Sequence, residues 1–270
     1  MAVNPKSLCD TFRRQAIWTW DSLRQARTAS CQLGEESLTD FNLLRIRTRH
    51  PHEVFTRTFT KPQEAQTGAD WEWWFTGPSR KWLGFRVQAK VIDLRTDTFK
   101  HLHYKRHKSG AYQSDDLVNS ARASNPPRIP VYCLYMNVSN WRSIRRGGAC
   151  GSYPLTPRSF GCMLVGARQI QRLRSRPSAT GVNDIMAFAT PWHCLVCCRG
   201  YGNGDLPNRA RAFWMHRQSA PDIARDEIPE LTDTPPNYVS ALMRGEFLEP
   251  PDDRALRTVT IFRELEERVD

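Results

Sequence analysis

Long apolar runs are missing from this sequence, and several familiar motifs are missing with them. No window approaches the ~18 consecutive apolar residues that a membrane-spanning helix needs. The first ten residues, MAVNPKSLCD, lack the apolar stretch of a signal peptide. There is also no Walker-type glycine loop, no GxGxxG motif and no GxSxG motif. We therefore expect a cytoplasmic protein without a membrane partner, whose function does not depend on these common motifs.

Acidic residues are outnumbered by basic ones. The chain of 270 residues has 39 Lys and Arg against 28 Asp and Glu, a formal net charge of +11. A positive field raises the encounter rate with polyanions, and nucleic acid is the commonest polyanionic partner. A solvated basic surface explains the charge equally well, so charge alone leaves both interpretations open. The hydrophobic fraction of 40% is ordinary for a globular protein with a sizeable core.

The spacing of apolar residues predicts an α/β chain in which a helix, three strands, a helix and a strand follow an N-terminal helix. We predict helices over residues 6–28, 35–47 and 113–123, and strands over residues 53–60, 69–75, 82–94 and 130–137. A tight turn at Gly77 and Pro78 favours a hairpin between the second and third strands. Beyond residue 140 the pattern predicts a helix over 161–175, a strand over 191–198, a short helix near 237–243 and a closing strand over 256–264.

These elements are compatible with one domain in three parts. Residues 1–30 form a helix that packs on the core, residues 31–140 form the core, and residues 141–270 extend the same domain with an unknown role. Trp71, Trp73 and Trp74 could stack nucleic-acid bases. Large aromatic side chains usually bury, however, so we expect these tryptophans in the hydrophobic core.

Two of the predicted strands carry polar residues on one face. Because side chains alternate along a strand, Asp70 and Glu72 share one face of the strand over 69–75. Arg86, Gln88 and Lys90 share one face of the next strand, opposite an apolar face that suits the core. A hairpin could bring Asp70 and Lys90 together. The alternative is an ordinary cross-strand ion pair on a wet sheet face.

An acid, an amide and an amine in this arrangement suit phosphodiester hydrolysis. That reaction needs metal ions to neutralise charge on the phosphate, an activated water and a fixed cation for the transition state. Mg²⁺, or Mn²⁺ in its place, prefers hard oxygen ligands and takes only one or two protein carboxylates. A minimal site is therefore one or two carboxylates, an amide or backbone carbonyl and a lysine, and the hairpin could bring Asp70 and Lys90 together in such a site.

The helix over 35–47 offers that further carboxylate. Projected at about 100° per residue, Leu33, Phe41 and Leu44 form one stripe, which we expect to pack against the protein. Glu36 lies at the edge of that stripe, whereas Glu35 lies further round the helix. We therefore predict Glu36 as the helix ligand. The alternative is an ordinary surface carboxylate near a helix N-terminus.

A helix Glu, a strand Asp and Gln-x-Lys on the next strand together resemble the PD-(D/E)xK nuclease superfamily. GADWEWW followed by VQAK also resembles an uncharacterised bacterial family placed in that superfamily. The resemblance covers roughly residues 33–137 and implies a restriction-endonuclease-like core. It implies a metal-dependent nuclease that acts on DNA, and the setting that the family suggests is bacterial restriction or antiviral defence. The residues that it marks are Asp70 as metal ligand, Gln88 at the second acidic position, Lys90 as the lysine, Glu36 as the helix carboxylate and Gln113 near the substrate.

The basic stretch before residue 113 is a candidate for contacts with the phosphate backbone of a nucleic acid. Lys105, Arg106 and Lys108 would face phosphates there, although a solvated charged loop is the plainer interpretation. A homodimer is left open.

Gln88 departs from the acidic residue that the superfamily usually carries. An amide carbonyl can bind a metal but brings no charge, so activity would depend on Asp70 and a second carboxylate as metal ligands, with Glu36 or Glu72 as the second. Two alternatives therefore remain: a catalytically inactive nucleic-acid-binding protein with the nuclease fold, and a structural or sensor protein.

Eight cysteines are present, and without a secretion signal we expect them to be reduced thiols. Cys194 and Cys197 have zinc-like spacing, and Cys150 and Cys162 could complete a set of four thiolates. Because Cys194 and Cys197 lie in an apolar run without the turn that zinc sites need, we favour buried, small apolar side chains instead.

Overall fold

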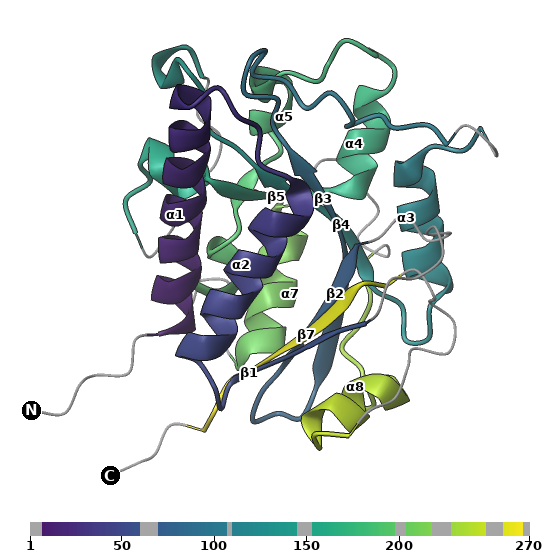
Figure 1. Cartoon of the computed structure of the whole chain (residues 1–270). Coiled ribbons are helices and arrows are strands. Elements are labelled where there is room, and N and C mark those ends of the chain that lie inside the picture. Colours follow the sequence, from purple (N-terminus) through teal and green to yellow (C-terminus); the bar gives the residue numbers. More distant parts are fainter. Residues whose placement is uncertain are drawn as a thin grey trace, which may run out of the picture.

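A seven-stranded mixed sheet forms the centre of the computed structural model, with helices on both faces (Figure 1). The structure describes residues 7–59, 70–106, 110–144, 153–197, 204–217, 228–246 and 256–266. The strands are β1 (Val54–Thr58), β2 (Trp71–Thr76), β3 (Trp82–Val91), β4 (Ile129–Tyr135), β5 (Cys162–Gly166), β6 (Thr190–Pro191) and β7 (Thr258–Arg263). Their order across the sheet is β1-β7-β2-β3-β4-β5-β6. The predicted α/β class is confirmed.

Helices α1 (Leu8–Thr28), α2 (Glu35–Arg49) and α7 (Leu206–Arg217) lie on one face of the sheet, where α1 and α7 contact its aromatic side chains. Phe12 of α1 meets Trp73, and Trp214 of α7 meets Phe85, with ring centroids 6.4 and 5.9 Å apart. Helices α3 (Gln113–Ala123), α4 (Ala167–Leu173) and α8 (Asn237–Met243) lie on the other face. The remaining short helices are η1 (Trp141–Ser143), η2 (Pro157–Phe160), α5 (Val182–Met186) and α6 (Cys194–Cys197).

The order α2, β1, β2, β3, α3, β4 matches the predicted order of the first half. β2 and β3 form the predicted antiparallel hairpin, and β3 and β4 run parallel, with α3 between them in the chain. The closing strand, β7, lies between β1 and β2, antiparallel to β1 and parallel to β2. A strand from the C-terminal part therefore completes the sheet that the first three strands begin.

Alternation along the hairpin separates an apolar face from a polar one. Trp71, Trp73 and Phe75 face the main core together with Phe85 and Val87 of β3. As expected, the tryptophans of β2 are buried. The opposite face carries Glu72 and Trp74 on β2, and Arg86, Gln88 and Lys90 on β3. Local β periodicity thus places the predicted polar residues on one side of the sheet.

The orientation of α2 differs from the prediction. Phe41 and Leu44, expected in the packed stripe, are 53% and 56% exposed. The buried residues of the helix are Leu38, Thr39, Asn42, Leu43 and Ile46. The polar members of that face are hydrogen-bonded: Thr39 Oγ1 lies 2.9 Å from the Tyr135 hydroxyl, and Asn42 Nδ2 donates to Thr19 Oγ1 at 3.0 Å. Because these bonds satisfy their polar groups, Thr39 and Asn42 can be buried while the apolar Phe41 and Leu44 stay exposed.

Two predictions in the second half were wrong in part. The stretch over 161–175 is the strand β5 followed by the helix α4. The stretch over 191–198 begins with the end of the two-residue strand β6 and continues as the short helix α6; Cys198 lies outside the described residues. Residues 161–167 and 191–197 are buried throughout, and an apolar run that is buried on all sides does not reveal its period. The short helix over 237–243 is confirmed as α8.

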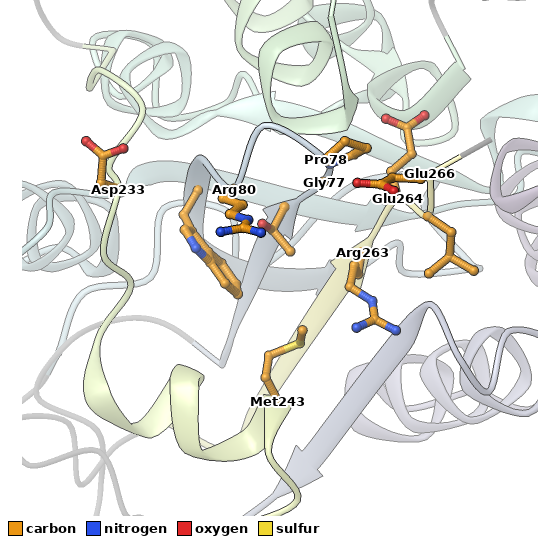
Figure 2. Close-up of a pocket in the computed structure, with 11 residues that line it drawn as sticks. Gly77, Pro78, Arg80, Asp233, Met243, Arg263, Glu264 and Glu266 are labelled. Carbon is orange, nitrogen blue, oxygen red and sulfur yellow. The ribbon is translucent and has the colours of Figure 1, made fainter. Parts of the chain in front are cut away.

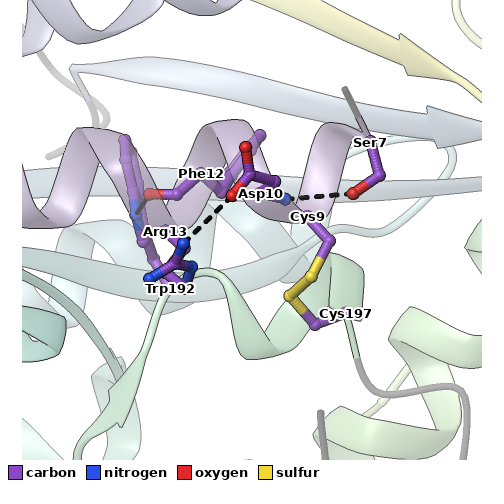
Figure 3. The surroundings of a disulfide bond; sticks show 7 residues. All are labelled: Ser7, Cys9, Asp10, Phe12, Arg13, Trp192 and Cys197. Atoms are coloured by element: carbon purple, nitrogen blue, oxygen red, sulfur yellow. Dashed lines mark hydrogen bonds and ion pairs between the residues drawn. A yellow bond between two sulfur atoms is a disulfide. The ribbon is translucent and has the colours of Figure 1, made fainter. Parts of the chain in front are cut away.

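A disulfide bond joins Cys9 of α1 to Cys197 of α6, as Figure 3 shows. The expectation that all cysteines are reduced was therefore wrong for this pair. Cys31, Cys133 and Cys162 are free thiols. Because the disulfide uses Cys197, the four-thiolate zinc site considered from the sequence is excluded in that form. Cys150 lies outside the described residues.

Candidate active site

Asp70 stands immediately before β2 and reaches across to β3. Its backbone amide donates to the Val87 carbonyl at 2.9 Å, where the pairing of the two strands begins. Its carboxylate oxygen Oδ2 accepts hydrogen bonds from the Ala89 amide at 2.8 Å and from Gln88 Nε2 at 2.6 Å. Within the described residues, no hydrogen bond is made to Oδ1. One oxygen of the carboxylate is thus held, and the other keeps its lone pairs for a ligand.

Two glutamine side chains, Gln88 and Gln113, extend the hydrogen-bond chain that begins at Asp70. Gln88 donates to Asp70 through Nε2, and its Oε1 accepts a hydrogen bond from Gln113 Nε2 at 2.7 Å. Gln113 is the first residue of α3. Its own Oε1 is buried and lacks a hydrogen-bond partner in the part of the chain that the structure describes. Gln113, expected near the substrate, therefore contacts Gln88 directly.

Lys90 is buried on the same side of β3, two residues beyond Gln88. Its ammonium nitrogen lies 3.7 Å from Glu35 Oε2, and Glu35 Oε1 accepts a hydrogen bond from the Val91 amide at 3.3 Å. Glu35 opens α2 at the carboxyl end of β3. It precedes Leu38, Thr39 and Asn42 by three, four and seven residues, which is the spacing of one helix face. The face of α2 that packs on the protein therefore carries Glu35 to Lys90.

Electrostatics link these three charged groups. Burial raises the pKa of the Asp70 carboxyl from its ordinary 3.8 to about 6. The Lys90 ammonium and the Ala89 hydrogen bond oppose that rise, whereas the Glu35 carboxylate adds to it. Asp70, Lys90 and Glu35 therefore lie close enough to act on one another. They form, with Gln88 and Gln113, the cluster that we call the Asp70 cluster.

Tyr132 borders the Asp70 cluster and was not predicted. It pairs with Gln88 in the parallel register of β3 and β4, so the two side chains share a face. Burial, and then the charge of Asp70, raise the pKa of the Tyr132 hydroxyl. In the sequence, Tyr132 looks like one more apolar residue of a buried strand, and only the β3–β4 pairing places its hydroxyl here.

Glu36, the predicted helix ligand, lies outside the cluster. Its side chain is 78% exposed, and its Oε2 lies 3.3 Å from Nη1 of Arg257. The error follows from the misplaced stripe of α2, because a helix turned to bury Phe41 and Leu44 would bring Glu36 inward. The spacing of Glu35 to Leu38, Asn42 and Ile46 could have shown the right face, had the polar Asn42 been recognised as buried.

Glu72, the other predicted ligand, belongs to a separate buried network. Its Oε1 lies 3.1 Å from Arg86 Nε and 2.7 Å from Arg128 Nε. Its Oε2 accepts hydrogen bonds from the Tyr238 hydroxyl at 2.5 Å and from Trp74 Nε1 at 3.0 Å. Both oxygens of this fully buried carboxylate are therefore engaged by protein groups, and Glu72 is not available as a metal ligand in this arrangement.

The basic residues predicted to contact the nucleic-acid backbone lie beside the start of α3. Lys105 forms an isolated bridge with Tyr112 and places its ammonium 5.5 Å from the centre of that ring. Arg106 pairs with Asp116 of α3, with Nε 3.2 Å from Oδ2. Lys108 falls outside the described residues. Lys105 and Arg106 are thus on the side of the molecule where Gln113 begins α3.

A pocket of about 600 Å³ lies elsewhere, at the turn of the β2–β3 hairpin (Figure 2). Gly77 and Arg80 line it from the turn, and Arg263, Glu264 and Met243 line it from β7 and α8. Asp70 is at the opposite end of β2, so this pocket is distinct from the Asp70 cluster. Among the described residues, no group of three or more His, Cys, Asp or Glu side chains gathers in a way that could hold a metal ion.

A family model covers almost the whole chain, over residues 8–268. The chain belongs to DUF6615, a family of unknown function. No curated protein matches it. The matched residues include all the elements of the Asp70 cluster and both halves of the sheet, but the family description assigns no activity. In the described ranges, no helix is long and apolar enough to cross a membrane.

Proposed function

We propose that this DUF6615 member is a metal-dependent nuclease of the PD-(D/E)xK type that hydrolyses phosphodiester bonds, with DNA as its substrate. The observation that carries the proposal is the Asp70 cluster itself. The acid Asp70, the amide Gln88 and the amine Lys90 come from the two arms of a hairpin and occupy neighbouring places at one end of it. The order α2, β1, β2, β3, α3, β4 supports a restriction-endonuclease-like core around that cluster.

The residues of the Asp70 cluster fit a hard divalent cation. Asp70 Oδ1 is an oxygen without a hydrogen bond from the described residues. Glu35 supplies a second carboxylate nearby, which is 28% exposed and has longer contacts, of 3.3 and 3.7 Å, than the buried Glu72. Mg²⁺ usually keeps several waters and takes one or two protein carboxylates, so two acids suffice. A structural zinc site would need four protein ligands, mostly Cys or His, and this cluster contains neither. Asp70 and Glu35 would therefore hold Mg²⁺ or Mn²⁺, and the Gln88 carbonyl would assist.

Each residue has a definable task in such a reaction. When bound, the metal would polarise the phosphate and lower the pKa of a water. Lys90 would place its ammonium against the charge that develops on the phosphate, because a fixed cation in a buried site is worth more than one in water. Glu35 would orient Lys90 through their 3.7 Å ion pair. Asp70 would stay in position through the Ala89 amide.

Charge supports a nucleic-acid substrate. The net charge of +11 favours approach of a polyanion, and Lys105 and Arg106 lie beside the helix that begins with Gln113. Contacts of Lys and Arg to phosphates position a nucleic acid without reading its sequence. We therefore propose that Lys105 and Arg106 contact the phosphate backbone of the nucleic acid.

The decisive assay is cleavage of supercoiled plasmid DNA, linear DNA and RNA in Mg²⁺ or Mn²⁺, with EDTA as control. We expect metal-dependent cleavage by the wild-type chain and none by Asp70→Ala or Lys90→Ala. Circular dichroism would establish that both variants fold. Cleavage that persists undiminished in both folded variants would remove the proposal.

One observation favours a second candidate. Gln88 turns its N–H group, not its carbonyl, toward Asp70, and it replaces the acid that the superfamily usually carries. The alternative is therefore a nucleic-acid-binding protein without turnover. It predicts salt-dependent DNA binding and no cleavage with either metal. Absence of DNA binding even at low salt would instead favour a structural or sensor protein.

A further inference from the structure

Gln113 leaves a buried oxygen without a partner. Its Nε2 donates to Gln88, but its Oε1 is buried and accepts no hydrogen bond from the described residues. A buried acceptor without a hydrogen bond costs free energy, so such groups are rare in folded proteins. This orphaned oxygen belongs to the residue that contacts Gln88, and Gln88 in turn contacts the Asp70 carboxylate, to which the proposed function assigns a metal.

The Gln88 amide is oriented against metal binding. Its Nε2 points to Asp70 Oδ2 at 2.6 Å and also donates to the Ala89 carbonyl at 3.1 Å. A cation at Asp70 that also takes the Gln88 carbonyl as a ligand would need the Gln88 oxygen in the place of that N–H group, because a metal binds lone pairs and repels N–H dipoles. An amide can exchange its N and O positions by rotation about its terminal bond without changing shape.

Reversal of Gln88 alone would bring two donors together. The reversed Gln88 Nε2 would face Gln113 Nε2, and neither could accept the other's hydrogen. If Gln113 also reverses, its Oε1 accepts from Gln88 Nε2, and its own Nε2 takes the buried place that Oε1 held. The two amides can therefore satisfy one another in only two arrangements, and these differ in whether Gln88 shows Asp70 a donor or an acceptor.

We propose that Gln113 is a positioning residue whose amide reverses together with that of Gln88, and that this paired reversal turns the Gln88 carbonyl toward a divalent cation at Asp70. The inference rests on the proposed function, since it concerns the same metal site. It gives Gln113 a task different from substrate contact. The Asp70 cluster then has a metal-free and a metal-competent arrangement, and Gln113 determines how readily the second forms.

A double-variant cycle on Mn²⁺ affinity tests this, with free Mn²⁺ measured by electron paramagnetic resonance on the full chain. Gln113→Met keeps the size of the side chain and removes both amide groups. We expect it to weaken Mn²⁺ binding by roughly 10-fold or more, as loss of a residue that orients a metal ligand usually does. In a chain that already carries Gln88→Met, the same change should alter the affinity by less than about 2-fold, because the two residues act as a unit.

Gln171→Met is the matched control. Gln171 is a partly buried glutamine of α4 that donates to Asp115 of α3 at 2.8 Å, so it supports the same helix without touching Gln88. We expect its loss to leave Mn²⁺ affinity within about 2-fold of the wild type. Gln113→Glu supplies a rescue that a packing role would not produce. A carboxylate only accepts, so it holds Gln88 with its carbonyl toward Asp70, and Mn²⁺ binding should be retained or tightened.

The outcomes separate the two proposals. If the wild-type chain binds no Mn²⁺, the proposed function fails and the paired reversal fails with it. If the wild type binds Mn²⁺ but Gln113→Met behaves like Gln171→Met, only the paired reversal is overturned. The same holds if the effects of Gln113→Met and Gln88→Met simply add. A retained affinity in Gln113→Glu that persists in the Gln88→Met chain would show an effect of charge alone and would also overturn it.

Discussion

Glu35 contacts Lys90, and its neighbour Glu36 does not. The carboxylate of Glu35 lies 3.7 Å from the Lys90 ammonium, whereas Glu36 turns outward to Arg257 at 3.3 Å. The side chains are 28% and 78% exposed, respectively. One position along α2 thus separates a member of the Asp70 cluster from a surface residue, and this pair offers a test in which each variant controls for the other.

Glu35→Gln should lower the rate of DNA cleavage by roughly 10-fold or more, because residues that orient the ligands and cations of a site are worth that much. Glu36→Gln should leave the rate within about 2-fold of the wild type, since a solvent-exposed ion pair contributes little. Single-turnover cleavage in Mg²⁺ measures both. Equal losses in the two variants would show that general surface charge, and not the contact to Lys90, supports the activity.

Asp70→Asn should stabilise the chain when metal is absent. The folded-state pKa of Asp70 is raised to about 6, so the ionised carboxylate opposes folding. The protonated carboxyl of Asp70 stabilises the folded chain. This stabilisation is complete below the unfolded pKa near 4 and is lost as the pH rises through the folded pKa near 6. In EDTA at pH ~8 the variant should exceed the wild type by up to about 3 kcal/mol in the free energy of unfolding.

That gain should stay nearly constant between pH ~8 and ~7 and shrink as the pH falls through 6 toward 4, which urea unfolding at several pH values would measure. Added Mn²⁺ should then raise the melting temperature of the wild type more than that of Asp70→Asn, because a ligand stabilises only the chain that binds it. A gain that does not change with pH would show that the carboxyl is not penalised by burial.

Glu72 should matter for stability and not for metal binding. Glu72→Ala leaves the guanidinium groups of Arg86 and Arg128 buried without their shared carboxylate, so we expect a loss of about 3–5 kcal/mol in the free energy of unfolding. Tyr238→Phe removes one hydroxyl from the same network and should cost only about 1–2 kcal/mol. Mn²⁺ affinity, measured below the melting temperature, should be unchanged in Tyr238→Phe. A marked loss of affinity there would connect the two networks.

The disulfide should contribute to stability only under oxidising conditions. Cys9→Ser prevents its formation, and we expect a loss of about 2–4 kcal/mol without reductant, because the cross-link restricts the unfolded chain. In dithiothreitol the variant and the wild type should unfold alike. Cys31→Ser is the control, since Cys31 is a free, exposed thiol. If Cys9→Ser loses as much stability in reductant as without it, packing of the sulfur is responsible and not the bond.

Much of the Asp70 cluster is predictable because it is local. Asp70, Gln88 and Lys90 lie in a hairpin whose short turn sets the register, and β alternation then places all three on one face. The same alternation buries Trp71 and Trp73 on the other face. Gln113 was predicted as a site residue, but its contact with Gln88 depends on how α3 docks, which no local pattern contains.

By itself, the sequence determined the α/β order, the hairpin and the acid, amide and amine that share its polar face. Only the tertiary structure decided which glutamate joins them, that β7 lies between β1 and β2, and that Cys9 meets Cys197. The reason is physical. Periodicity reports which side of an element is apolar, whereas Thr39 and Asn42 bury because distant partners, Tyr135 and Thr19, satisfy their hydrogen bonds.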